Sequence, residues 1–145
     1  MQNSIATILQ AKGRKVHSVA PETSVFDALK VMAEANVGAL VVLNQGKLCG
    51  IISERDYARK IALMGRTSPG TQVKDIMATR VLCVRPEQTV HECMALMTAK
   101  AVRHLPVLEN KVVVGIVSIG DLVKSVIGEQ QFIIEQLETY IHGAH

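Results

Sequence analysis

The sequence predicts a mixed α/β (α+β) fold built from two similar halves. Residues 16–57 align with residues 81–122 at a constant offset of 65, without a gap, and 14 of the 42 positions are identical. Each copy shows short apolar runs typical of strands and apolar residues at helical spacing, in the order β-α-β-β-α. One copy is too long for a solenoid turn and small for an independent domain. Two copies are therefore expected to pack face to face about a pseudo-twofold axis.

The first half is predicted from strand patterns, helix caps and turn residues. A short helix capped by Ser4 precedes it, followed by a basic turn at residues 12–15. Ser24 can cap a helix whose apolar residues recur every three or four positions, and Asn44 to Lys47 form a hairpin-type turn. The predicted elements are helix 4–10, strand 16–19, helix 24–36, strands 40–43 and 48–52, and a helix that opens at Ser53.

The second half repeats this order after a loop at residues 65–70, which is rich in Gly, Ser, Thr and Pro. Its predicted elements are a short lead-in helix at 71–77, strand 81–84, helix 89–99, strands 105–108 and 112–118, and a helix from residue 120 or 121 that continues over 129–141. The chain then divides into a lead-in (1–15), a first motif (16–64), a linker with a lead-in helix (65–80), a second motif (81–128) and a C-terminal helix (129–145).

Two helical stripes supply much of the expected core. Val25, Ala28, Leu29 and Met32 form the first stripe, and its copy in the second half is expected to pack near it across the pseudo-axis. That copy comprises Val90, Cys93, Met94 and Met97. Apolar residues left over in the C-terminal helix favour a homodimer face, formed by Phe132, Ile133, Leu137 and Ile141.

Composition limits the function. Aromatic residues are 3% of the chain and the net charge is +3, which argues against a nucleic-acid binder but suits a small anionic ligand. No apolar run approaches the length of a membrane span, and no histidine or cysteine spacing indicates a metal site. The three cysteines include no CxxC, so free thiols in a reducing cytoplasm are expected.

The paired motifs resemble those of the CBS-domain family. The resemblance rests on GIISERD at residues 50–56, GIVSIGD at 115–121, VKDIM at 73–77 and RHLPVL at 103–108. The resemblance covers almost the whole chain. The chain is similar to stand-alone CBS-pair proteins of bacteria and plant organelles. It implies a Bateman module of two motifs that binds adenosine-containing ligands in two clefts and pairs into dimers. AMP is the first expectation, with NAD, ADP or ATP as alternatives, and S-adenosylmethionine is also used in the family.

A ribose-binding role is predicted for Asp56 and Asp121. Ser53 and Ser118 each end a strand and can cap the next helix, whose first N–H groups attract phosphate. A carboxylate three residues on can accept two hydrogen bonds from the 2′- and 3′-hydroxyls of a ribose, as the matching aspartate does in the family. The same S-x-x-D spacing also forms a helix capping box, and the two interpretations are compatible.

By the family pattern, each cleft combines the start of one motif with the middle and end of the other. The first would contain Lys15, Val16, His17, Arg103, His104, Leu105, Pro106, Ser118, Gly120 and Asp121. The second would contain Arg80, Val81, Leu82, Cys83, Gly38, Ala39, Leu40, Ser53, Arg55 and Asp56. The clefts are not equivalent, since Arg103 and His104 stand where the first repeat has Gly38 and Ala39, and Arg55 stands where the second has Gly120.

The sequence therefore favours a regulatory module over two alternatives, an enzyme that acts on a bound nucleotide and a nucleic-acid-binding protein. The module would sense an adenine nucleotide and signal by a change of orientation to a regulated protein that no motif identifies. An enzyme acting on the nucleotide is disfavoured, because no Walker loop, GxGxxG, GxSxG or catalytic carboxylate pair is present. No catalytic residue, metal or catalytic cofactor is expected, and the expected location is the cytoplasm.

Overall fold

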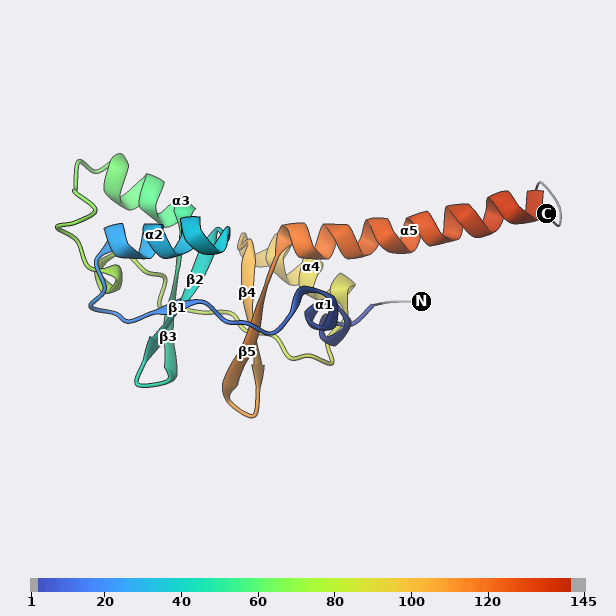
Figure 1. The fold of residues 1–145 in the computed structure, drawn as a ribbon, viewed down its shortest axis with the longest axis horizontal. Helices are drawn as coiled ribbons and strands as arrows, with labels where there is room; N and C mark the ends of the chain where they lie inside the picture. The colour runs from blue at the N-terminus through green and yellow to red at the C-terminus, as the bar shows by residue number, and fades with distance from the viewer. Residues whose placement is uncertain (1–2, 142–145) are drawn as a thin grey trace.

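The computed structural model describes residues 3–141 and confirms the predicted fold class. Two halves, each with its own small sheet, lie side by side (Figure 1). The sheets meet at their helical ends, and the C-terminal helix projects far beyond the body of the molecule. The interface between the halves is therefore where a shared site can form.

The first half contains a three-stranded sheet in the order β1-β2-β3. β1 runs parallel to β2, and β2 pairs antiparallel with β3 with a register shift between Val42 and Leu43. Ser24 caps α2 by accepting a hydrogen bond from the Asp27 N–H at 3.0 Å, as the sequence predicted. The elements are β1 (Ser18–Val19), α2 (Val25–Ala35), β2 (Ala39–Asn44), β3 (Lys47–Ser53), α3 (Glu54–Tyr57) and the one-turn π-helix η1 (Ala58–Ala62).

The second half repeats the hairpin, including the register shift, now between Val107 and Leu108. The helix predicted from residue 120 or 121 and continuing over 129–141 is present as one continuous helix, α5. The elements are the 3₁₀ turn η2 (Val73–Asp75), α4 (Val90–Lys100), β4 (His104–Glu109), β5 (Val112–Ser118) and α5 (Ile119–Ile141).

The predicted strand at residues 81–84 is wrong, because only Val84 bridges to Val107 of β4. Two bonds form this bridge, from the Val84 N–H to the Pro106 carbonyl and from the Leu108 N–H to the Val84 carbonyl. The next rung of a parallel ladder would need an N–H at Pro106, which proline lacks. The first repeat has Val41 at this position, and there β1 extends by one residue, with Ser18 opposite Val41.

The segment that leads into each motif packs on the other motif. Helix α1 (Ile5–Lys12) precedes the first half but lies against the second, and η2 precedes the second half but lies against the first (Figure 1). Three equivalent pairs of backbone hydrogen bonds fix these contacts at 2.8–2.9 Å. On the second half, the N–H groups of Ile5, Ala6 and Val90 donate to the carbonyls of Gln88, Pro86 and Asn3. On the first half, the N–H groups of Val73, Lys74 and Val25 donate to the carbonyls of Thr23, Pro21 and Thr71.

Two separate apolar cores result. Ile5, Ile8 and Leu9 of α1 are buried in the second core, and Val73 and Ile76 are buried in the first. The expectation that the two helical stripes pack near each other is therefore wrong. Val25, Ala28 and Met32 belong to the first core, and Val90, Cys93 and Met97 belong to the second. Each stripe faces its own sheet and the borrowed lead-in segment.

The segment that leads into the second motif packs closely over Gly50 of β3. A Cβ at Gly50 would lie 2.5 Å from Met77 Sδ and 3.0 Å from the Ala78 carbonyl oxygen. Gly50→Ala should therefore push the lead-in away from β3 and weaken the Ile51–Ala78 backbone pair. We expect a loss of about 1–3 kcal/mol in the free energy of unfolding, measured with urea.

Gly128→Ala is the matched control. A Cβ there meets nothing within 4 Å, and the residue lies inside α5. Alanine should be neutral or stabilise by roughly 0.5–1 kcal/mol, because it favours helix over glycine. Equal unfolding free energies for Gly50→Ala and the native chain would contradict the packing argument.

Candidate functional site

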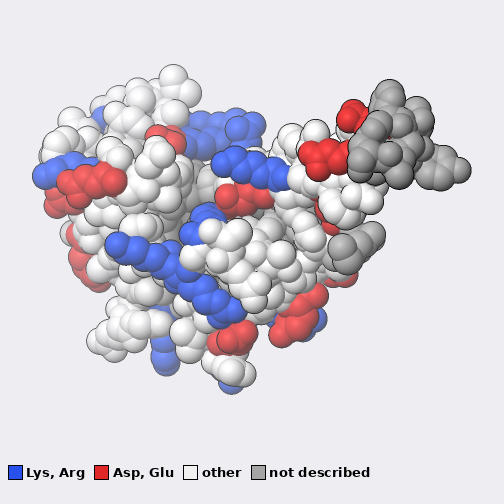
Figure 2. All heavy atoms as spheres, turned by 45° about the vertical axis from the view of Figure 1, so that its right-hand side comes forward, with Lys and Arg blue, Asp and Glu red and all other residues white. Residues whose placement is uncertain are grey.

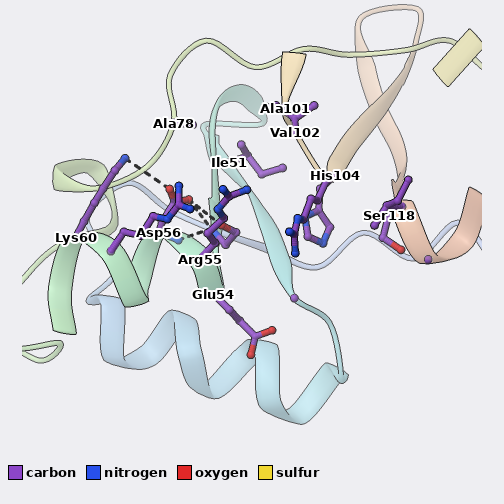
Figure 3. Close-up of a pocket in the computed structure, with 16 residues that line it drawn as sticks. Ile51, Glu54, Arg55, Asp56, Lys60, Ala78, Ala101, Val102, His104 and Ser118 are labelled. Atoms are coloured by element: carbon purple, nitrogen blue, oxygen red, sulfur yellow. Dashed lines mark hydrogen bonds and ion pairs between the residues drawn. The ribbon is translucent and has the colours of Figure 1, made fainter. Parts of the chain in front are cut away.

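A cavity of about 690 Å³ lies between the two halves, where both β-hairpins meet the helices that follow them (Figure 3). Ser53 ends β3 on one side and Ser118 ends β5 on the other. The lining residues are Gly38, Ile51, Ser53, Glu54, Arg55, Asp56, Arg59, Lys60, Ala78, Ala101, Val102, Arg103, His104, Ser118, Ile119 and Gly120.

Eight predicted site residues line this cavity, and they come from both predicted clefts. Four are from the first half and four from the second: Gly38, Ser53, Arg55, Asp56, Arg103, His104, Ser118 and Gly120. Twelve others do not line it: Lys15, Val16, His17, Ala39, Leu40, Arg80, Val81, Leu82, Cys83, Leu105, Pro106 and Asp121. Leu40 and Leu105 are fully buried in the two cores. The part that each of the twenty plays in binding stays a prediction.

Sequence reasoning missed half of the lining. Arg59 and Lys60 lie three and four residues after Asp56, a spacing that brings side chains together on a helix. That spacing was a usable signal. Ala101 and Val102 carried none, because they reach the cavity only through the turn between α4 and β4. The missed residues are Ile51, Glu54, Arg59, Lys60, Ala78, Ala101, Val102 and Ile119.

The Asp56 carboxylate is held at the cavity wall by its own helix cap. Its Oδ2 accepts hydrogen bonds from the Ser53 N–H at 3.0 Å and from the Ser53 hydroxyl at 3.1 Å. The Asp56 N–H in turn donates to Ser53 Oγ at 3.2 Å, which completes a capping box. Lys60 Nζ lies 3.5 Å from Oδ1 (Figure 3). It also donates to the Ile76 carbonyl at 2.8 Å. The predicted capping geometry is therefore present.

Asp121 repeats this cap but faces a different cation. Its Oδ2 accepts from the Ser118 N–H at 2.8 Å, and the Asp121 N–H donates to Ser118 Oγ at 3.2 Å. Lys12 Nζ, at the end of α1, donates to the same Oδ2 at 2.7 Å and to the Ile116 carbonyl at 2.9 Å. Burial alone would raise the pKa of Asp121, but the hydrogen bonds from Lys12 and Ser118 outweigh it and lower that pKa.

Positive charge dominates the cavity. Four cationic side chains, Arg55, Arg59, Lys60 and Arg103, line it with the carboxylates Glu54 and Asp56. Basic side chains border the hollow between the two halves on the face in Figure 2, with acidic groups among them. An anionic ligand would therefore be attracted to this cavity.

His104 is the partly buried imidazole of the site and points into the cavity in Figure 3. Burial lowers its pKa most, the Lys12 charge adds to this, Asp121 opposes it, and Arg103 lowers it further. At neutral pH the ring is therefore uncharged and offers one donor and one acceptor. A bound anion would favour the protonated ring.

Two of the three cysteines have thiols that burial makes less acidic. Burial raises the pKa of the Cys83 thiol, and it raises that of Cys93 to about 11 with help from Glu92. Both thiols therefore hold their protons at neutral pH, which disfavours reaction with oxidants. Across residues 3–141, no group of three or more potential metal ligands lies together. Of the helices described, none is both long and apolar enough to cross a membrane.

Comparisons with known proteins agree with the repeat. Residues 12–63 and 73–128 match the family described as CBS domain. A mitochondrial CBS domain-containing protein of Arabidopsis thaliana, CBSX3, is 40% identical over 151 residues, covering 98% of this chain and 73% of the relative. A protein with CBS domains from Burkholderia ambifaria has a TM-score of 0.85 at 48% identity, covering 88% of this chain and 96% of that one.

A more distant structure shares the fold alone. It is a CBS domain pair solved with 5′-methylthioadenosine and S-adenosyl-L-methionine, with a TM-score of 0.78 at 23% identity, covering 89% of this chain and 99% of that one.

The lowered pKa of His104 predicts a pH effect on stability. Because the folded state prefers the neutral ring, the unfolded chain binds more protons at mildly acidic pH. The free energy of unfolding should therefore fall as the pH drops below the ordinary histidine value of about 6.5. In NMR titrations the His104 ring should titrate below that value, and His104→Gln should flatten the pH dependence of urea unfolding. A His104 pKa at or above about 6.5 would contradict this prediction.

Proposed function

The chain belongs to the CBS-domain family, and from this premise we propose that it is a regulatory module that binds an adenine nucleotide between its two halves. AMP is the first candidate, and ADP, ATP and NAD are the alternatives. One observation carries the proposal: a single cavity joins a capped, oriented carboxylate, Asp56, to four cationic side chains. The carboxylate suits the hydroxyl groups of a sugar, and the cationic side chains suit a phosphate joined to that sugar.

The cavity walls fit the parts of a nucleotide. Asp56 has a second oxygen, Oδ1, at 3.5 Å from Lys60, and the carboxylate would accept hydrogen bonds there from the hydroxyls of a ribose diol. Phosphate would lie among the cationic side chains, where charge-assisted hydrogen bonds are strong. The apolar Ile51, Ala78 and Val102 offer a surface for the base.

Binding between the halves would allow a signal. The same ligand would touch Arg55 in the first half and Arg103 in the second, so its affinity depends on how the halves are oriented. A ligand shifts a conformational equilibrium only through such a difference in affinity. We propose that this shift is read by a regulated protein.

The proposed role is regulatory rather than catalytic. The Asp56 carboxylate accepts hydrogen bonds from Ser53 and lies beside Lys60, and this fixed arrangement suits it to accept hydrogen bonds from hydroxyl groups. A location in the cytoplasm remains a prediction, and the Arabidopsis relative is named as mitochondrial.

We also propose that the module is a homodimer through α5. Within its described side chains, the projecting part of this helix exposes several large apolar residues, including Phe132 (59% exposed) and Leu137 (55%). Ile127, Ile133 and Ile134 add to this exposed surface. A second copy would supply an identical surface, as twofold interfaces require. Ile141, also predicted for this face, has a side chain outside the described residues.

Loss of the Asp56 charge should weaken nucleotide binding. Each hydrogen bond to a charged group is typically worth about 1.5–3 kcal/mol, so Asp56→Asn should lower the affinity for AMP by roughly tenfold or more. Isothermal titration calorimetry measures this directly, and 2′-deoxy-AMP should bind the native chain more weakly than AMP. Asp27→Asn, an exposed carboxylate on α2, is the control and should leave the affinity unchanged. Equal affinity for AMP in Asp56→Asn would argue against the proposed ribose contact.

Polar substitutions on α5 should separate the dimer. The double substitution Phe132→Ser with Leu137→Ser removes two exposed apolar side chains without touching either core. Light scattering after size exclusion should give twice the chain mass for the native protein and a single chain mass for the variant. Gln130→Ser with Gln136→Ser is the control on the same helix and should remain dimeric. A native protein that is monomeric at high concentration would refute the interface.

A further inference from the structure

The two repeat-related carboxylates, Asp56 and Asp121, are in different states. Both accept hydrogen bonds from the serine that ends the preceding strand. Asp56 lines the cavity, whereas Asp121 does not, although Ser118 and Gly120 beside it do. The difference lies in the cation that each carboxylate meets.

Lys12 covers Asp121. Its Nζ is 2.7 Å from Asp121 Oδ2, compared with 3.5 Å between Lys60 Nζ and Asp56 Oδ1. It also donates to the Ile116 carbonyl at 2.9 Å, so two hydrogen bonds anchor the ammonium group. Lys60 is not the repeat counterpart of Lys12. Its own counterpart in the second half is Ser125. The Lys12 contact is therefore particular to the Asp121 end.

Lys12 can leave Asp121 without unfolding α1. The helix is anchored in the second core by Ile5, Ile8 and Leu9, and Lys12 is its last residue. The Lys12 side chain is 35% exposed and that of Asp121 is 21% exposed. A change of the lysine side chain alone would uncover the carboxylate.

Resting on the function proposed above, and on the ribose-binding role predicted for Asp121, we infer that Lys12 restricts the Asp121 end to adenosine ligands that carry phosphate. A neutral ribose diol that replaced Lys12 at Asp121 would leave the ammonium group without its anion. Arg103 lies at the same end and adds further positive charge there. A ligand with a 5′-phosphate gives both residues a new partner. Its diol donates hydrogen bonds to Asp121, and its phosphate accepts a hydrogen bond from Lys12.

Lys12 is thus a specificity-determining residue. It would favour AMP over adenosine, and it would disfavour S-adenosylmethionine, whose sulfonium adds positive charge. The Asp56 end lacks so tight a lysine contact and is open to the cavity, so it discriminates less between adenosine and AMP.

The test is calorimetry of the full chain with adenosine and with AMP. The native protein should bind AMP at two sites per chain and adenosine at one. Lys12→Met keeps the aliphatic chain and the helix preference but removes the charge. It should gain a second adenosine site, and its affinity for AMP at that site should fall by roughly tenfold, the value of one charge-assisted hydrogen bond.

Two further variants assign the sites. Asp121→Asn should bind both ligands at one site only, since it removes the charge that holds the diol. Lys47→Met, an exposed lysine at the hairpin turn of the first half, should behave as the native chain does. Thermal unfolding of each variant checks that the fold is retained.

The outcomes separate this inference from the proposed function. If adenosine fills both sites of the native chain as AMP does, or if Lys12→Met binds adenosine as the native chain does, the role of Lys12 is wrong while nucleotide binding stands. If no variant binds either compound, the proposed function is overturned and this inference falls with it.

Discussion

The exchange of lead-in segments holds this molecule together. Each motif is completed by the segment that precedes the other one: α1 fills the core of the second half, and η2 fills that of the first. Neither half can bury its apolar residues without the segment that the other half carries in sequence. The connectivity therefore keeps the two halves side by side, and the cavity lies between them. Lys12 reaches Asp121 only because α1 crosses to the second half.

Repeat symmetry explains which parts of the fold the sequence could predict. Helices α2 and α4 follow from their capping Ser24 and Thr89 and from apolar spacing, and the hairpins follow from their apolar strands. The failure at residues 81–84 has a local cause, the missing N–H of Pro106, which lies in the partner strand and not in the segment itself. The separate cores could not be foreseen, because the sequence pattern shows that a helix face is apolar but not which sheet covers it.

The candidate site was predictable where it depends on the repeat. Ser53 with Asp56, and Ser118 with Asp121, recur at the same offset, and both pairs have the capping geometry that their spacing indicates. What could not be predicted depends on contacts between distant segments. Lys12 and Asp121 are more than a hundred residues apart, and no local pattern marks their meeting.

The surroundings of Asp56 and Asp121 differ at the positions where the two repeats have different residues. The first half has Glu54, Arg55 and Lys60 where the second has Ile119, Gly120 and Ser125, so the charged groups of one helix start are replaced by small or apolar ones in its copy. None of these three residues of the second half supplies a cation to Asp121. The cation it meets comes instead from α1, a segment outside the repeated unit. Because that cation belongs to another element, Lys12 can change its partner from Asp121 to another anion without disturbing the helix cap that orients Asp121. The same exchange at Asp56 would move Lys60, which also donates to the Ile76 carbonyl of the borrowed lead-in. Lys60 thereby connects the Asp56 end of the cavity to the segment that ties the two halves together.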